Sequence, residues 1–188
     1  MSEPRRTLLD KLWSDHAIVT SPQGEDLLYV DFNLINEGQS FLAFDQLRME
    51  ARSVRRPHQH LAVTDHYLPT TNRSLGPAAI LNAEIRRVVE MLDENATEFA
   101  LPHIGWHHPD QGIAHVIAPE LGLAQPGMLI TCNDSHTATN GACAACPAGK
   151  SRRASSRLPR IAARMLLKSC AMPPASVPIA SIFCAWRS

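Results

Sequence analysis

Two short apolar segments that each end in an acid and an imidazole limit the possible folds of this chain more than any other feature. The segment "LAVTDH" (61–66) ends in Asp65 and His66, and "GMLITCNDSH" (127–136) ends in Asp134, Ser135 and His136. Runs that are apolar throughout are typical of strands buried on both faces of a parallel sheet. Because ligands bind at the carboxyl edge of such sheets, we expect both polar clusters to meet there.

Segments with a helical period separate these strands. Apolar residues recur at three- and four-residue spacing in 7–15, 40–51 and 78–98, and Thr7 is placed to cap the first of these helices. The segment 26–35 is rich in residues that favour strands. This alternation predicts an α/β domain with a largely parallel sheet.

The distribution of charge divides the chain into two parts. The 188 residues are enough for one domain with a core, but all eighteen acids lie at or before Asp134. Residues 135–188 contain eight Lys and Arg, and Ala, Arg, Ser and Pro predominate after about residue 142, where only 160–170 resembles a helix. We therefore expect a folded domain over 1–142 and a poorly ordered, basic tail over 143–188.

No apolar run approaches the length of a membrane-spanning helix. The first residues also lack the apolar core of a signal peptide, which predicts a cytoplasmic protein that does not enter a membrane.

Three sites in the sequence that contain an acid, an imidazole or both are candidates for proton transfer. They are the Asp65–His66 pair, the Asp134–Ser135–His136 cluster, and His115 beside a Gly-containing turn. A carboxylate that binds one ring nitrogen of a histidine fixes its tautomer and raises the basicity of the other nitrogen, which suits acid–base chemistry near neutral pH. Each group alone is more often structural, and their joint occurrence at strand ends favours catalysis. A serine hydrolase is not indicated, because Ser135 lacks a G-x-S-x-G elbow.

Several other polar residues indicate structure and not a metal site. The "CAAC" at 143–146 lacks the further ligands of a zinc or iron–sulfur site, and the five cysteines indicate no disulfide framework. In "HIGWHH" (103–108), His103 and His107 would be metal ligands on a helix, but Gly105 and Pro109 favour a surface loop. The pair His58 and His60, beside Arg55 and Arg56, is expected in a solvated basic loop.

Long stretches of the chain resemble a known family. The segments are "LLYVDFNLINE", "VRRPHQHLAVTDHYLPTTNR" and "HPDQGIAHVIAPELGLAQPGMLITCNDSHTATNGA". They resemble the amino-terminal part of the large subunits of 3-isopropylmalate dehydratases, in the aconitase family, over about residues 7–142. The resemblance implies an α/β/α domain that helps to enclose a [4Fe–4S] cluster. It also implies a hydro-lyase that interconverts 2-isopropylmalate and 3-isopropylmalate through 2-isopropylmaleate in leucine biosynthesis.

The same resemblance assigns roles to site residues. The catalytic positions of the family fall on six residues, namely Asp65, His66, His115, Asp134, Ser135 and His136. It implies that His66 protonates the departing hydroxyl while Asp65 orients it, and that His115 pairs with Asp134. Ser135 and His136 would complete the surroundings of the substrate.

The likeness has two departures from the family pattern. Asn133 stands where the family commonly has Gly, and the likeness stops after Ala142. The three cysteines that ligate the family's cluster lie beyond that point, so Cys132, Cys143 and Cys146 are not assigned to it, and no metal ligand is predicted. The tail has the composition of a shifted reading frame, and we expect this truncated chain to be inactive alone.

The expected partners and alternatives follow from this assignment. The partners implied are the small subunit of the dehydratase and a small hydroxy-acid substrate. One alternative is another hydratase of the family, acting on citrate or a methylated malate. The other is a non-catalytic protein whose basic tail binds nucleic acid, although the tail has no recognisable nucleic-acid motif.

Overall fold

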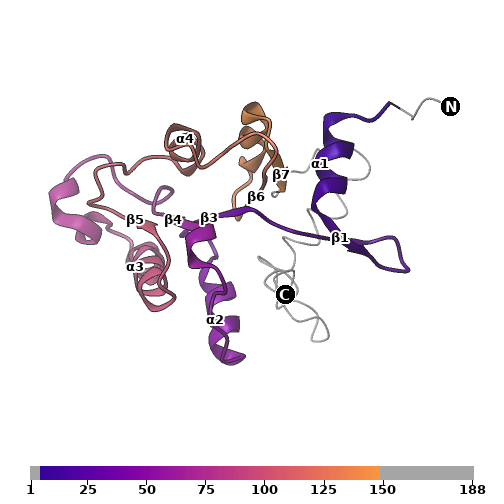
Figure 1. Ribbon diagram of the computed structural model, residues 1–188. Coiled ribbons are helices and arrows are strands. Elements are labelled where there is room, and N and C mark those ends of the chain that lie inside the picture. Colours follow the sequence, from indigo (N-terminus) through magenta and orange to yellow (C-terminus); the bar gives the residue numbers. More distant parts are fainter. Residues whose placement is uncertain (1–4, 149–188) are drawn as a thin grey trace.

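A five-stranded parallel sheet forms the centre of the molecule (Figure 1). In the computed structural model, which describes residues 5–148, the strand order is β5-β4-β3-β6-β7. The strands are β3 (Phe32–Asn36), β4 (His60–Val63), β5 (His103–Ile104), β6 (Leu129–Cys132) and β7 (Cys146–Ala148). Each pair of neighbours runs parallel, which confirms the predicted α/β class.

Helices cover both faces of this sheet (Figure 1). Helices α2 (Phe41–Met49) and α3 (Ala83–Glu98) pack on one face through Phe44, Leu47 and Leu92. Helix α4 (Ala114–Glu120) packs on the other face through Ile117 and Ala118. Successive strand residues alternate between the two cores, since Leu34 belongs to the α4 side and Ile35 to the α2 and α3 side. The described part is therefore an α/β/α arrangement.

The amino-terminal elements form a small attached unit. Helix α1 (Leu8–His16) begins at Thr7, whose hydroxyl accepts from the Asp10 amide, as predicted. Strands β1 (Ala17–Thr20) and β2 (Asp26–Leu28) then form an antiparallel hairpin. The strand-favouring segment 26–35 therefore contains β2 and most of the central strand β3, separated by a turn. The chain turns at Asp31, whose carboxylate accepts from the Leu129 amide and binds the His16 ring, and β3 begins after this turn.

Short 3-10 helices connect the main elements. They are η1 (Pro57–Gln59), η2 (Arg73–Ala79) and η3 (Thr137–Cys143). The helix predicted over 78–98 begins only at Ala83, because the Asn82 side chain accepts from two amides and caps it there. Leu81, which lies within the predicted range, precedes the cap and is exposed.

The sheet extends past the expected domain boundary at residue 142. Strand β7 pairs with β6, and Cys146 is buried against Leu129, so the folded unit reaches at least Ala148. The predicted helix at 160–170 and the rest of the predicted tail lie outside the described residues. Among residues 5–148, no helix is long and apolar enough to cross a membrane.

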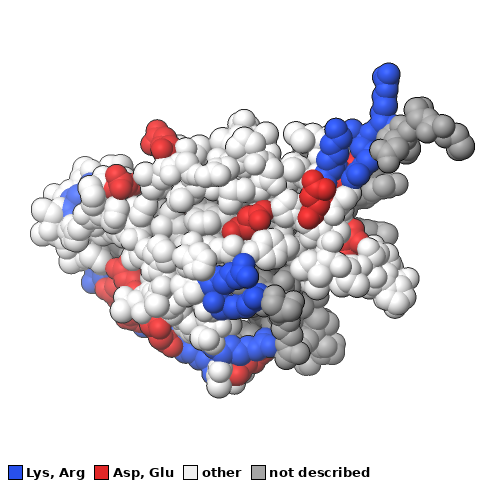
Figure 2. Space-filling model, viewed as in Figure 1, with Lys and Arg blue, Asp and Glu red and all other residues white. Residues whose placement is uncertain are grey.

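Charged side chains are mixed on the face seen in Figure 2. Lys and Arg are interspersed with Asp and Glu there, and the described residues form no continuous basic patch on this face. A nucleic-acid surface in the described domain has no support from this view, and the basic tail lies outside the described residues.

Candidate active site

The carboxyl ends of three adjacent parallel strands form the site. Strand β4 leads into Asp65 and His66, and β6 leads into Asp134. Strand β3 lies between them in the sheet. Because all three strands point the same way, their ends lie at one edge, and the two predicted clusters meet across the end of β3.

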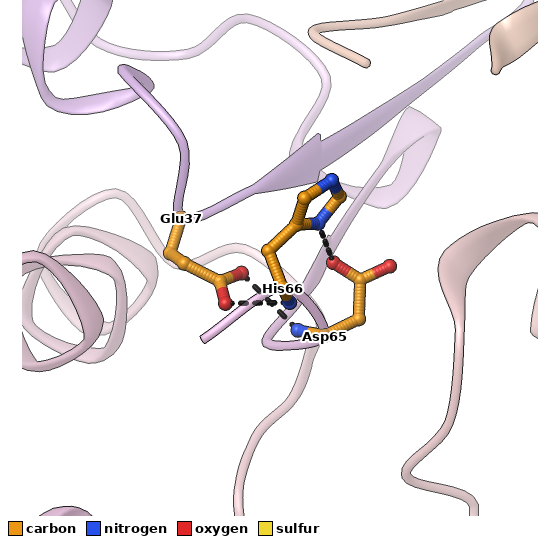
Figure 3. A group of neighbouring side chains, drawn as sticks. All are labelled: Glu37, Asp65 and His66. Carbon is orange, nitrogen blue, oxygen red and sulfur yellow. Dashed lines mark hydrogen bonds and ion pairs between the residues drawn. The ribbon is translucent and has the colours of Figure 1, made fainter. Parts of the chain in front are cut away.

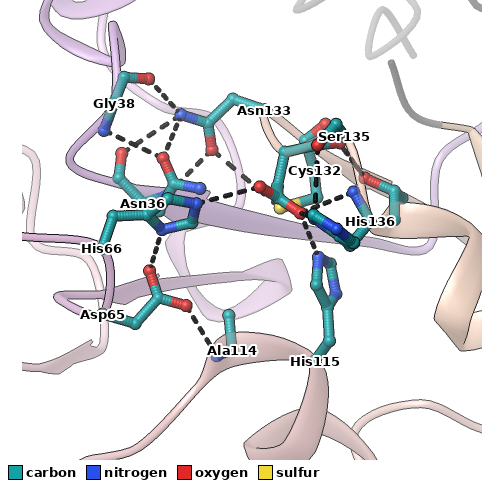
Figure 4. Close-up of polar contacts among 12 residues, drawn as sticks. Asn36, Gly38, Asp65, His66, Ala114, His115, Cys132, Asn133, Ser135 and His136 are labelled. Atoms are coloured by element: carbon teal, nitrogen blue, oxygen red, sulfur yellow. Dashed lines mark hydrogen bonds and ion pairs between the residues drawn. The ribbon is translucent and has the colours of Figure 1, made fainter. Parts of the chain in front are cut away.

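His66 lies between two carboxylates (Figure 4). Its Nδ1 is 2.5 Å from Asp65 Oδ1, and its Nε2 is 2.9 Å from Asp134 Oδ2. Ionised carboxylates only accept hydrogen bonds, so both ring nitrogens must carry protons to make both contacts. The ring is therefore held as an imidazolium, and its side chain remains 39% exposed.

Asp134 also binds a second imidazole. Its Oδ1 is 2.9 Å from His115 Nε2 and accepts from the His136 amide at 2.6 Å. Both His115 and Asp134 are buried. His115 enters the site because α4, which carries it, packs on the sheet beside β6.

Asp65 connects His66 to helix α4, which carries His115. Its Oδ1 binds His66, while its Oδ2 accepts from the Ala114 amide at 2.8 Å. Ala114 is the first residue of α4, and Ile113, which precedes it, offers no capping side chain. One buried carboxylate thus orients His66 and caps the helix that carries His115.

Ser135 and His136 lie at the outer side of this cluster. The His136 side chain is 80% exposed, and its Nδ1 is 3.3 Å from Asp134 Oδ1 and 3.2 Å from Ser135 Oγ. Ser135 is also exposed. The structure therefore brings Asp65, His66, His115 and Asp134 into one hydrogen-bonded network, in which His66 is partly exposed, with Ser135 and His136 at its rim.

The contacts shift the pKa values of His66 and Asp134 in opposite directions. The hydrogen bond to Asp65, opposed by partial burial and aided by Asp134, raises the pKa of His66 to about 9. Burial would raise the pKa of the Asp134 carboxyl, but hydrogen bonds from the His136 amide, His115 and His66 outweigh it and hold that pKa at about 2. The pair is therefore charged throughout the neutral range.

Two residues of the site were not identified from the sequence. Glu37 follows β3 directly, and its buried carboxylate accepts from the backbone of the Asp65–His66 turn. Asn133 follows β6, and its side chain binds Asn36 and Gly38 on either side of Glu37. The sequence could have identified both as site residues, because each is polar and directly follows a strand-like segment.

The other histidines differ from their expected settings. His60 is buried in β4, not in a solvated loop, and its Nδ1 is 3.1 Å from the Asn33 amide nitrogen. Its neighbours Arg55 and Arg56 made the segment look exposed, but the sheet begins at His60 itself. His103 lies in the short strand β5 instead of a loop, and its Nε2 is 3.2 Å from Asp93 Oδ1.

The thiols of the described residues do not fit a [4Fe–4S] cluster. Cys132 belongs to the core on the α4 side, whereas Cys146 belongs to the core beneath α1. The register of β6 and β7 places Cys146 opposite Leu129, so Cys132 points to the other face of the sheet. Burial raises the pKa of the Cys132 thiol to about 12, which opposes thiolate formation. Within residues 5–148, no three cysteines converge.

Comparison with known families adds one finding. A family model described as the aconitase family (aconitate hydratase) matches residues 10–152, which is more than half of the chain. The match includes all three strand ends of the site and all six predicted catalytic residues. Their catalytic roles remain predictions.

Proposed function

This chain belongs to the aconitase family and carries a hydro-lyase domain of that family, and on this premise we propose that its site is built to bind 2-isopropylmalate and 3-isopropylmalate, although we expect no turnover by this chain without an iron–sulfur cluster. The resemblance of residues 7–142 to the large subunits of 3-isopropylmalate dehydratases supports this substrate. The single observation that supports the chemistry is His66, a partly exposed imidazolium held between two buried carboxylates.

His66 would act as the acid. Dehydration breaks a C–O bond, and the departing hydroxyl leaves as water when it takes a proton from a positioned donor. His66 Nε2 would supply this proton once a substrate hydroxyl takes the place of Asp134 Oδ2, which lies 2.9 Å from Nε2. Asp65 would hold Nδ1 throughout, so that the ring keeps its direction after the proton has left.

Asp134 and His115 would stabilise the neighbouring charge. Before transfer, Asp134 balances the His66 cation, and afterwards it remains bound to His115 and the His136 amide. In the reverse reaction, water would return its proton to the neutral His66 ring. The base that removes the C–H proton is not in this network, and we place it on a small-subunit partner, as the resemblance implies.

A ligand titration tests the substrate without requiring turnover. The ring signals of His66 and His115 in the full chain should shift saturably in NMR spectra when 2-isopropylmalate is added. Equal or larger shifts with citrate or a methylated malate would favour the other hydratase of the family. Absence of any shift with all three acids would contradict the proposed site.

A further inference from the structure

Glu37 lies beside the turn that carries Asp65 and His66 (Figure 3). It directly follows β3, and its side chain is almost completely buried, with 1% of its surface exposed. A buried carboxylate is costly unless several donors compensate it, so its partners indicate why it is there.

Three consecutive backbone amides compensate Glu37. Its Oε2 accepts from the Asp65 amide at 3.1 Å, and its Oε1 accepts from the amides of His66 and Tyr67 at 2.7 and 2.8 Å. Consecutive amides that converge in this way form a concave site for an anion. Glu37 is the anion that fills it.

This arrangement argues against a metal ion at the same place. Glu37, Asp65 and His66 place potential ligand atoms within 4.8 Å of one another. However, both Glu37 oxygens already accept amide protons, and both Asp65 oxygens are bound by His66 and the Ala114 amide. A cation would have to displace these donors, whose positive ends point at the same oxygens.

Asn133, at the end of β6, holds Glu37 in place through the residues on either side of it. Asn133 Oδ1 accepts from the Asn36 amide, and its Nδ2 donates to Asn36 Oδ1 and to the Gly38 carbonyl. The residues on both sides of Glu37 are thus fixed to the end of β6, which also carries Asp134. The end of β6 is thus joined to the Asp65–Tyr67 turn through the hydrogen bonds of Asn133, the backbone of residues 36–38 and the hydrogen bonds of Glu37.

We infer that Glu37 is a positioning residue, which fixes the Asp65–Tyr67 turn and thereby holds the His66 ring in line with both Asp65 and Asp134. Its charge also acts on the ring, together with Asp65 from the same turn and Asp134 from the end of β6. This role rests on the function proposed for His66. The test below reads the imidazole and not turnover, so the two proposals can fail separately.

The test uses NMR on the full chain and three variants. Glu37→Gln removes the charge and keeps the size, and Glu37→Asp keeps the charge but shortens the side chain. Glu120→Gln, at the exposed end of α4, is the matched control for loss of one charge. The measurements are the titration midpoint of His66, amide hydrogen exchange at residues 65–67, and thermal denaturation.

The expected result is specific to the ring and the turn. Glu37→Gln should lower the His66 midpoint by about one pH unit, as loss of a nearby opposite charge does. It should also accelerate exchange of the three amides at least tenfold. Glu37→Asp should restore part of the midpoint, and Glu120→Gln should leave both readouts unchanged. A purely structural role would lower the denaturation temperature of Glu37→Gln without moving the midpoint.

Two results would overturn the inference. One is a folded Glu37→Gln variant whose His66 midpoint and amide exchange equal those of the unmodified chain. If that variant does not fold, amide exchange in the unmodified chain tests the inference instead. Exchange of the amides of residues 65–67 as fast as that of an exposed loop would show that Glu37 does not hold them.

Discussion

His66 and Asp134, which are 68 positions apart in the sequence, meet at 2.9 Å across the end of β3. The contact exists because β4 and β6 are both parallel neighbours of β3, so that their polar ends share one edge of the sheet. It makes Asp134 the common partner of two imidazoles, one partly exposed and one buried.

Replacement of Asp134 by Asn should weaken the acid. The Asp134→Asn variant loses a negative charge next to His66 Nε2, so we expect the His66 titration midpoint to fall by about one pH unit. NMR titration of the ring protons measures this. Glu84→Gln, on the exposed first turn of α3, removes an equal charge outside the hydrogen-bond network of the site and should leave the midpoint unchanged. An unchanged midpoint in Asp134→Asn would contradict the contact.

Removal of the Asp65 side chain should affect both elements that it joins. Asp65→Ala should cost about 1 kcal/mol of unfolding free energy from the lost cap of α4. It should also lower the His66 midpoint, because the Nδ1 partner is gone. Asn82→Ala is the matched control, since Asn82 caps α3 and lies in no contact with the site. It should cost a similar free energy in urea denaturation and leave His66 unchanged; an equal shift of His66 in both variants would contradict this account.

Stability should fall in acid because His60 is buried. Burial, with a smaller effect of His58, lowers the pKa of His60 to about 4 from the ordinary value of 6.5. Between these values the unfolded chain binds more protons, so stability falls as pH decreases from 6.5 to 4, by roughly 3 kcal/mol. Urea denaturation across this range measures it.

The His60→Asn variant provides the control for this window. Its stability should change less between pH 6.5 and 4 than that of the unmodified chain. The Asp134 carboxyl stabilises the protein in a separate pH range. Because its folded pKa of about 2 lies below the ordinary value of 3.8, its stabilisation is complete above pH 3.8 and is lost as pH falls from 3.8 through about 2. If the unfolding free energy fell equally in His60→Asn and in the unmodified chain from pH 6.5 to 4, His60 would not be the cause.

The sequence predicted the elements whose signal is local. Buried runs identified β4 and β6, and the parallel arrangement then placed Asp65, His66 and Asp134 together. The capping side chain of Thr7 likewise marked the start of α1. These predictions succeed because each depends on neighbouring residues and on a general property of parallel sheets.

The features that were missed depend on contacts distant in the sequence. Strands β5 and β7 have two and three residues, which is too short for a periodic pattern. Helix α4 has an internal Pro119 and takes its cap from Asp65, 49 positions away. Glu37 was not identified because its three amide partners lie in the turn after β4, about thirty positions away in the sequence. None of these partners could be identified before the strand order was known.

Asn133, where the resembling family commonly has Gly, should contribute to stability. Asn133→Ala removes the hydrogen bonds that join β6 to Asn36 and Gly38, which we expect to cost roughly 2 kcal/mol of unfolding free energy. Urea denaturation measures this. Gln125→Ala, which removes one exposed hydrogen bond to the Gly122 carbonyl, should change stability by less than about 0.5 kcal/mol. Equal effects of the two substitutions would show that the Asn133 contacts are not formed.

The separation of the described cysteines predicts the outcome of cluster reconstitution. After anaerobic incubation with iron and sulfide, the purified chain should lack stoichiometric visible absorbance of a [4Fe–4S] cluster, because Cys132 and Cys146 face opposite sides of the sheet. It should also fail to turn over 2-isopropylmalate when a small subunit is added. Stoichiometric incorporation together with activity would require a set of ligands other than the described thiols.

The protonation of His66 in the full, unmodified chain tests the central claim most directly. An NMR titration of its ring protons from pH 5 to 11 should give a midpoint near 9, with the ring fully protonated at pH 7. The folded value then lies above 6.5, so the stabilisation by this contact is complete below pH 6.5 and is lost as pH rises through about 9. A midpoint near 6.5 would show that the two carboxylates do not hold the ring, and would contradict its role as the acid.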